Sequence, residues 1–324
     1  MKYLQHKYLP IMVTFGLFLL MFAFGSLRYT GFFSPQVILN LFIDNAFLII
    51  AAVGMTFVIL SGGIDLSVGA VIALTTMVTA SLLNSGISPW LVLPIALLVG
   101  PLLGFVMGCL IHFFNIQPFI VTLAGMFLAR GLSYVISVDT VVINNRIFEF
   151  MANARIYMGE YFISFSVLIA LVVVIFAIYI AHYTKFGRNV YALGGNEQSA
   201  LLMGIPVGKT KVTIYTFNGL CSSIAGVVFS FYMLSGYGLH AMGMELDVIA
   251  SVVIGGTLLT GGSGYVVGSV LGVLILGIIQ TLIVFEGTLS SWWTKIAIGI
   301  LLLLFIVFQR VSVLRSESQK TITF

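Results

Sequence analysis

The stretch Val167–Ile178 reads VLIALVVVIFAI, a continuous run of apolar side chains. Membrane β-barrel strands alternate apolar and polar residues over about ten positions, so this run favours a helix over a barrel strand. Similar runs recur along the whole chain, and a helix needs about 20 mostly apolar residues to cross the hydrocarbon core of a bilayer. The sequence therefore predicts an all-α, polytopic membrane protein.

Composition leads to the same fold class. Of the 324 residues, 60% are apolar and only 7% are charged, whereas a soluble protein surface carries roughly a quarter of charged residues or more. Neither of the two longest polar stretches, 138–161 and 184–211, is long enough to bury a core of its own. We therefore expect residues 1–324 to form a single transmembrane domain. About ten spans are expected, near 9–27, 38–60, 66–84, 90–113, 118–137, 162–183, 212–235, 246–260, 264–285 and 290–309.

Basic residues predict the orientation, because lysine and arginine gather on the cytoplasmic side of membrane proteins. With ten spans and the N-terminus inside, three arginines fall outside, and a larger basic set falls inside: Lys2, Lys7, Lys185, Arg188, Lys209, Lys211, Arg310, Arg315 and Lys320. Both termini and the loop at 184–211 are therefore expected in the cytoplasm, and the loop at 138–161 outside. The net charge of +4 reflects this bias and requires no nucleic-acid partner. The first apolar run is longer than a signal-peptide core, so we expect it to stay as an uncleaved span.

Two glycine-rich turns repeat one another. SGGIDLSVG at 61–69 and TGGSGYVVG at 260–268 share the spacing of a glycine pair and a later glycine, which suggests the internal duplication common in transporters. Gly62 and Gly63 permit a tight reversal, and with Asp65 and Gly69 they are the predicted structural turn. Asp65 is expected either to cap the following helix or to make a contact used in gating or with a partner.

Polar side chains within the spans are candidates for a translocation path. Asp44 and Asn45 fall in the second span and Arg130 falls in the fifth. Because ionisable groups are costly at membrane depth, they face either a partner or a cavity. The alternatives are a structural pair, such as Asp44 with Arg130, and a polar path. Trp292 and Trp293 are either interfacial anchors or stacking platforms for a substrate ring.

Other motifs predict no chemistry in this chain. The histidines are scattered, mostly at the ends of spans, and both cysteines lie within spans, so no metal site is expected. GIPVGKT at 204–210 is one residue short of a phosphate-binding loop and lies between helical segments, so no nucleotide site is expected. No series of acids and histidines forms a proton or sodium relay. The chain is therefore not expected to be an enzyme.

The loop at 184–211 predicts a docking surface. At its centre GGNEQSALLMG, residues 194–204, is typical of a short helix that Asn196 caps. Ala200, Leu201 and Met203 would form an apolar patch among charges, which suits the docking of another protein. An amphipathic helix resting on lipid is the alternative.

Three motifs carry a family resemblance. GGNEQSALLMGI at 194–205 resembles the cytoplasmic coupling motif of bacterial ABC sugar-importer permeases, with Ser199 where the family often has alanine. SGGIDLSVG at 61–69 and PFIVTLAGMFLARG at 118–131 are similar to the ribose/monosaccharide permease family. TLSSWWTKIAIGILL at 288–302 resembles the permease of the galactofuranose importer. The resemblance implies that ATPase coupling depends on Gly194, Gly195, Asn196, Glu197, Ala200 and Gly204.

The resemblance also implies partners and a cargo. It implies a bacterial inner-membrane assembly with a second, different permease chain, a periplasmic sugar-binding protein, and cytoplasmic ATPase subunits that bind ATP and Mg²⁺, so that this chain itself holds no cofactor. The expected cargo is galactofuranose. Other monosaccharides such as ribose, or branched-chain amino acids, are the alternatives within this class, and an ion-coupled secondary transporter or a structural membrane scaffold is the alternative outside it.

Overall fold

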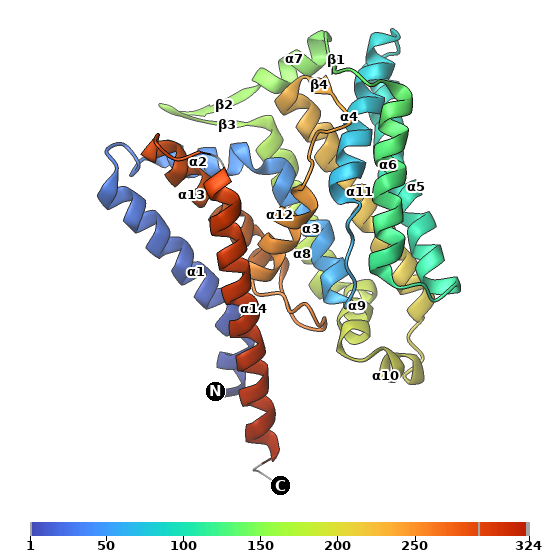
Figure 1. Ribbon diagram of the computed structural model, residues 1–324, viewed down its shortest axis with the longest axis vertical. Coiled ribbons are helices and arrows are strands. Elements are labelled where there is room, and N and C mark those ends of the chain that lie inside the picture. The colour runs from blue at the N-terminus through green and yellow to red at the C-terminus, as the bar shows by residue number, and fades with distance from the viewer. Residues whose placement is uncertain (1, 291, 322–324) are drawn as a thin grey trace.

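The computed structural model describes residues 2–290 and 292–321, which form helices joined by short loops and a few two- to four-residue strands (Figure 1). The helices are α1 (Lys2–Arg28), α2 (Pro35–Asp44), α3 (Ala46–Leu60), α4 (Val68–Asn84), α5 (Pro89–Phe113), α6 (Pro118–Ile136), α7 (Arg146–Asn153), α8 (Phe165–Tyr183), α9 (Lys185–Gly195), α10 (Glu197–Leu202), α11 (Val207–Met233), α12 (Met244–Ile254), α13 (Val266–Glu286) and α14 (Trp292–Thr321). The strands are β1 (Val141–Val142), β2 (Arg155–Met158), β3 (Tyr161–Ser164) and β4 (Ser235–Gly236). The predicted all-α class is confirmed.

Not all of the ten expected spans correspond to helices that are long enough to cross a bilayer. In the described part of the chain, seven helices are long and apolar enough: α1 from Pro10, α5, α6, α8, α11, α13, and α14 as far as Gln309. Helices α2 and α3 form an eighth candidate, bent by 60°. The predicted spans 66–84 and 246–260 correspond to α4, with 17 residues, and α12, with 11 residues. At 1.5 Å per residue these helices are about 25 Å and 16 Å long, shorter than a hydrocarbon core of about 30 Å.

Both short helices begin inside the molecule. Irregular segments lead to them: residues 61–67 run from the end of α3 to α4, and residues 237–243 run from β4 down to α12 (Figure 1). A Cβ atom at Gly69, in the first turn of α4, would collide with the Glu245 carboxylate in the first turn of α12. The N-termini of the two half-helices therefore lie side by side in the interior.

Helix α11 is the central helix, and it packs closely along α5. A Cβ atom at Gly100 would overlap the Gly219 carbonyl oxygen, and the Gly100 N–H donates to Ser223 Oγ at 2.7 Å. Glycines permit this approach of backbones, which matters in a membrane because packing rather than water exclusion holds helices together there. The close pair α5–α11 forms a rigid wall beside α4, whose Thr75 Oγ1 lies 3.4 Å from Ser223 Oγ.

The two ends of the molecule differ in content. The start of α1 and the end of α14 lie at the same end as α9 and α10, which agrees with the predicted placement of both termini beside the 184–211 loop (Figure 1). The opposite end carries α7, the antiparallel pair β2–β3, and β1 paired with β4. Basic side chains predicted inside at Lys2, Lys7, Arg310, Arg315 and Lys320 lie outside the described side chains.

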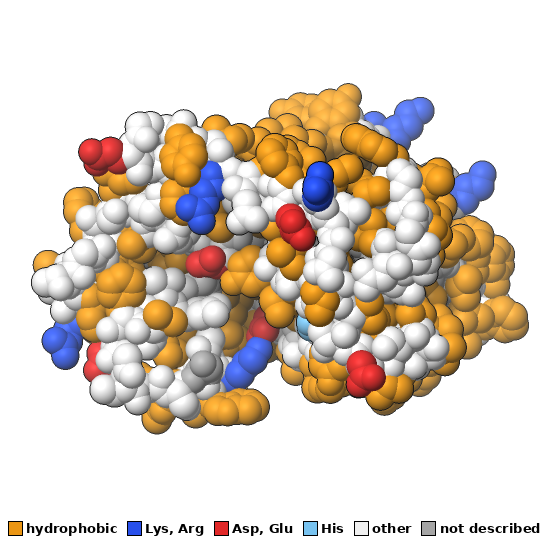
Figure 2. Space-filling model, turned by 90° about the horizontal axis from the view of Figure 1, so that it is seen from above, with side chains coloured by type: hydrophobic (Ala, Val, Ile, Leu, Met, Phe, Trp, Pro, Cys, Tyr) orange, Lys and Arg blue, Asp and Glu red, His pale blue; other side chains and the backbone are white. Residues whose placement is uncertain are grey.

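Exposed apolar side chains cover much of the outer surface of the helices, as the fold class predicts for a surface in contact with lipid. Val172 and Phe176 of α8 are 66% and 58% exposed, and Ile300 of α14 is 57% exposed. Seen from the end that carries α7, the molecule has a hollow between two lobes, with acidic, basic and histidine side chains beside it and further charged side chains at the outer edge (Figure 2).

Candidate functional site

The predicted coupling segment forms two short helices. Asn196 separates α9 from α10, and its Oδ1 accepts a hydrogen bond from the Ser199 N–H at 2.8 Å, so the predicted cap is confirmed. The short helix expected within 194–204 is α10, Glu197–Leu202, whereas Gly194 and Gly195 belong to the end of α9. Gly204 takes the left-handed conformation, with φ +76°, and ends the turn after α10.

The exposed apolar patch of this segment differs by one residue from the predicted one. Ala200 is fully buried, so it anchors α10 to the molecule and does not belong to the patch. Leu201, Leu202 and Met203 are instead 64%, 88% and 69% exposed. Three neighbouring apolar side chains on a short helix at the polar end of the molecule form a surface suited to docking another protein.

Directly behind this patch, α9 packs against both glycine-rich turns. The Gly262 N–H of the second turn donates to the Leu60 carbonyl oxygen of the first turn at 2.8 Å. A Cβ atom at Gly194 would overlap the same Leu60 oxygen and would lie 2.5 Å from Gly262 N. A Cβ atom at Gly261 would lie 2.8 Å from Gly62 N and 3.0 Å from the Gly194 oxygen. We call this contact of three backbone segments the glycine junction (Gly62, Gly194, Gly261 and Gly262, with Leu60).

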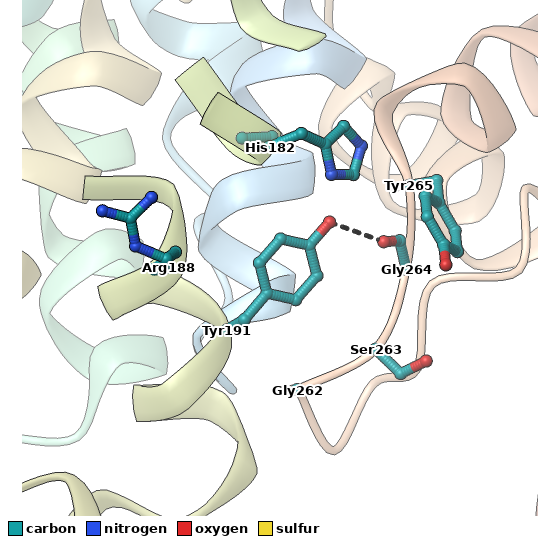
Figure 3. A pocket seen from close by; sticks show the side chains of 8 residues that line it. His182, Arg188, Tyr191, Gly262, Ser263, Gly264 and Tyr265 are labelled. Atoms are coloured by element: carbon teal, nitrogen blue, oxygen red, sulfur yellow. Dashed lines mark hydrogen bonds between the residues drawn. The ribbon is translucent and has the colours of Figure 1, made fainter. Parts of the chain in front are cut away.

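A cavity of about 410 Å³ borders one side of the glycine junction. His182 at the end of α8, Arg188 and Tyr191 of α9, and Ser263 and Tyr265 of the second turn line it (Figure 3). The Tyr191 hydroxyl donates to the Gly264 carbonyl oxygen at 2.8 Å, and burial raises the pKa of Tyr191 to about 12. This bond fastens α9 to the second turn beside the junction.

A second cavity, of about 290 Å³, borders the other side of the junction at the first turn. Its lining includes Gly62, Tyr215, and the ion pair between Lys211 Nζ and a Glu197 carboxylate oxygen at 2.6 Å. Because space lies on both sides of the junction, α9 can shift without compressing a closely packed core. The arrangement therefore suits a mechanical contact.

Asp65 links the first turn to α11. Its Oδ1 accepts hydrogen bonds from the Ser67 N–H at 2.8 Å and the Ser67 hydroxyl at 2.6 Å, and its Oδ2 accepts one from Asn218 Nδ2 at 2.8 Å. Asp65 accepts from Ser67, the N-cap residue, which itself makes no side-chain cap bond, so the expected cap of α4 by Asp65 is wrong. Fully buried, Asp65 instead holds the irregular segment 61–67 against the central helix.

The predicted path residues occupy different environments. Asp44 is exposed at the end of α2, whereas Asn45 is buried in the bend between α2 and α3 and donates from Nδ2 to the Leu41 carbonyl oxygen at 2.9 Å. Arg130 Nη1 donates to the carbonyl oxygens of Gly238 at 2.7 Å and His240 at 2.6 Å. The alternative in which Asp44 pairs with Arg130 is wrong: within the described residues, the ion pairs are Lys211–Glu197 and Lys295–Asp247.

The two tryptophans lie in the first turn of α14, with Trp292 78% and Trp293 50% exposed. Large exposed indole rings at the start of a membrane helix fit the role of interfacial anchors. Lys295 lies two residues after Trp293. Its Nζ donates to both carboxylate oxygens of Asp247, at 2.7 and 2.6 Å, and so links α14 to α12. The stacking role of the tryptophans stays a prediction.

Residues 37–306 match the family described as branched-chain amino acid transport system / permease component. The chain belongs to this permease family. The permease is 52% identical over 304 residues to the inner membrane ABC transporter permease protein YjfF of Escherichia coli, which covers 93% of this chain and 92% of that one. No solved structure matches the permease.

The names of two further relatives include a sugar. The fructose import permease protein FruG of Bifidobacterium longum is 43% identical over 95% of the permease and 92% of its own length. The ribose import permease protein RbsC of Haemophilus influenzae is 37% identical over 88% of each chain. The permease is accordingly a multi-pass protein of the inner membrane and a transport subunit.

Sequence reasoning missed several polar residues of the interior. Asn218, Glu245 and His240 were not predicted as site residues, and Tyr191 was not predicted as a link to the second turn. A signal existed for Asn218, since it is a lone amide within an apolar stretch of α11. For Glu245 the signal was an acidic residue at the edge of the shortest predicted span, where an ionisable group usually faces the protein interior.

Proposed function

We propose that the permease is the membrane subunit of an ABC importer for a monosaccharide, with galactofuranose as the expected cargo. The observation that carries this proposal is the exposed apolar surface of α10 directly connected, through the glycine junction, to both membrane turns. A motor docked on α10 would therefore move two membrane segments at once. The names of the fructose and ribose permeases support a monosaccharide, and the stretch TLSSWWTKIAIGILL supports galactofuranose.

The proposed assembly has four kinds of chain. Cytoplasmic ATPase subunits bind ATP and Mg²⁺ and dock on α10, a periplasmic binding protein delivers the sugar, and a second, different permease completes the membrane core. Mass spectrometry of the tagged, co-purified complex tests this composition. Recovery of two permease sequences supports the heterodimer, whereas a single permease sequence contradicts it.

Charge reversal at Glu197 tests the coupling. Glu197 is 53% exposed as a side chain, and exposed ion pairs contribute only about 0–1 kcal/mol, so Glu197→Arg leaves folding and membrane insertion intact. We expect it to abolish stimulation of the ATPase by the loaded binding protein, because it places a positive charge at the docking surface. Lys211→Met is the matched control, since it removes the same ion pair from the other side and keeps the Glu197 carboxylate.

The energy source distinguishes the proposal from its alternatives. Uptake of labelled D-galactose, D-ribose, D-fructose, D-allose and L-leucine is measured in proteoliposomes that hold either the whole complex or this chain alone. Sugar uptake that requires the complex and ATP supports an ABC monosaccharide importer. Uptake by the chain alone, driven by a cation gradient, would contradict the proposal, and ATP-dependent uptake of leucine in place of sugars would reassign the cargo.

A further inference from the structure

Two unpartnered polar atoms lie where the half-helices α4 and α12 begin. Glu245 Oε2 and His240 Nδ1 are buried, and neither has a hydrogen-bond partner within the described part of the chain. Glu245 is in the first turn of α12, and its carboxylate lies against Gly69 in the first turn of α4. Buried polar atoms are normally hydrogen-bonded, so two such atoms, one in the loop 237–243 and one in the helix turn that follows it, point to a partner that arrives from outside the chain.

The position of this loop is typical of a transport site. Residues 237–243 enter the interior as irregular backbone before α12 begins (Figure 1). At membrane depth such backbone is tolerated only where protein buries it or where it lines a cavity. Helix N-termini carry partial positive charge and free N–H groups, and two of them lie side by side here.

Arg130 fixes the conformation of the loop. Its Nη1 donates to the carbonyl oxygens of Gly238 and His240 at 2.7 and 2.6 Å. Between that anchor and α12, Ala241 has φ +54°, a left-handed conformation that non-glycine residues seldom adopt. Such strain persists only where the surroundings hold it, and it concentrates at functional sites. Arg130 is therefore occupied by the loop backbone and acts on the site by positioning it.

Aromatic rings pack beside His240. The His240 ring lies 5.4 Å from the Phe229 ring and 5.8 Å from the Tyr237 ring, centroid to centroid. Phe47 extends this group of rings, with its ring 4.8 Å from that of Phe229 and 5.8 Å from that of Tyr232. A sugar ring presents C–H groups that pack on aromatic faces and hydroxyls that require hydrogen-bonding partners once water is removed.

We propose that Glu245 and His240 bind the hydroxyl groups of an uncharged monosaccharide as it crosses the interior, and that Arg130 is a positioning residue for their loop. The proposal rests on the proposed function and names the substrate site of that same importer. A carboxylate only accepts hydrogen bonds, so it suits hydroxyl donors and repels a phosphorylated sugar. The imidazole supplies a nitrogen for a further hydroxyl.

The test compares the selectivity of variants in the complete importer. The labelled sugar is the one among D-galactose, D-ribose, D-fructose and D-allose that the wild-type complex takes up fastest. Uptake of this sugar and of each of its monodeoxy analogues is measured in proteoliposomes that hold the whole complex, with the binding protein outside. The binding protein is the same for every variant, so a change in the ratio of kcat/KM between sugar and analogue arises in the permease. We expect Glu245→Gln to lower that ratio at least about tenfold for one analogue, because one hydrogen bond to a charged group is lost.

Asp247→Asn is the control, since it lies two residues along the same half-helix and pairs with Lys295 outside the loop. A structural effect lowers uptake of sugar and analogue alike and leaves their ratio unchanged, and this is the expected result for Asp247→Asn. His240→Gln repeats the test at a partly exposed position if Glu245→Gln does not assemble.

The proposed site is overturned if Glu245→Gln has the same kcat/KM ratio between sugar and analogue as the wild type. If Glu245→Gln does not assemble, an unchanged ratio in His240→Gln overturns the site. Failure of the wild-type complex to take up any of the sugars overturns the proposed function instead.

Discussion

The glycine junction makes a prediction whose magnitude follows from the structure. In Gly194→Ala the added methyl group overlaps the Leu60 carbonyl oxygen and lies 2.5 Å from Gly262 N, and both neighbours are backbone atoms that cannot rotate away. Overpacking of this kind costs about 1–3 kcal/mol. Loss of the bond from Gly262 N–H to Leu60 O, now 2.8 Å long, adds about 0.5–1.5 kcal/mol. The gain from replacing a helical glycine by alanine is smaller, about 0.5–1 kcal/mol.

Gly195→Ala is the matched control for this change. Beyond the adjoining backbone, no atom of the described residues lies within 4 Å of a Cβ atom built at Gly195, so alanine there brings only the propensity gain. The two variants should differ by about 1.5–4.5 kcal/mol in free energy of unfolding, from the overpacking and hydrogen-bond terms above. For a chain of this size that corresponds to about 3–9 °C between their apparent Tm values. Thermal melts of the purified complex in nanodiscs measure it, and equal Tm values for the two variants would refute the junction as a close backbone contact.

Three further changes test other contacts by the same thermal assay. Tyr191→Phe removes the bond to the Gly264 carbonyl oxygen and should cost about 0.5–1.5 kcal/mol, whereas Tyr183→Phe, at a 73% exposed position, should cost nothing measurable; equal losses would contradict the link. Asp65→Asn exchanges an acceptor for a donor opposite Asn218 Nδ2 and should cost about 1.5–3 kcal/mol, so an unchanged Tm would show that the buried link does not hold the segment 61–67. Gly100→Ala should cost about 1–3 kcal/mol by separating α5 from α11, while Gly131→Ala, with open space around its Cβ position, should not destabilise the complex.

Local properties of the sequence were enough for the fold class and for some details of the coupling segment. Continuous apolar runs such as Val167–Ile178 predict membrane helices because hydropathy alone decides whether a segment can lie in lipid. The cap at Asn196 was predictable because it depends on residues only three positions apart. The left-handed turn at Gly62, with φ +81°, follows in the same way from a glycine pair.

Hydropathy could not give the true lengths of α4 and α12. Both helices are apolar because other helices surround them, and burial in protein selects the same side chains as contact with lipid. Most residues of α4 are buried, as are Val248 and Val252–Ile254 of α12. A stretch such as 246–260 therefore scores as a span although its helix ends at Ile254.

The polar contacts of the interior were out of reach for a different reason. Arg130 has carbonyl oxygens as partners more than 100 residues away, and a carbonyl group is present at every position of the sequence. Side-chain chemistry suggested Asp44 as the partner because opposite charges attract, but the pairing depends on how α6 meets the loop before α12. That loop contains His240 and leads to Glu245 in α12, and the absence of a hydrogen-bond partner for His240 Nδ1 and Glu245 Oε2 among the described residues appears only in three dimensions.

The contacts of the two repeated glycine turns show how a movement of α9 can reach the interior of the molecule. The first turn begins the irregular segment 61–67, which leads from the junction to Gly69, and α12 leads from Glu245 to the segment that holds Gly261 in the second turn. At about 3.3 Å per residue, a segment of this kind can extend across more than half of a bilayer. Because Gly194 touches both turns, a displacement of α9 reaches Gly69 and Glu245 from two directions. Those two residues are in contact with each other, so a shift of either segment alters the environment of the Glu245 carboxylate. Force applied at α10 and affinity for the sugar at Glu245 are thereby coupled through backbone contacts that a side chain at Gly194 would break.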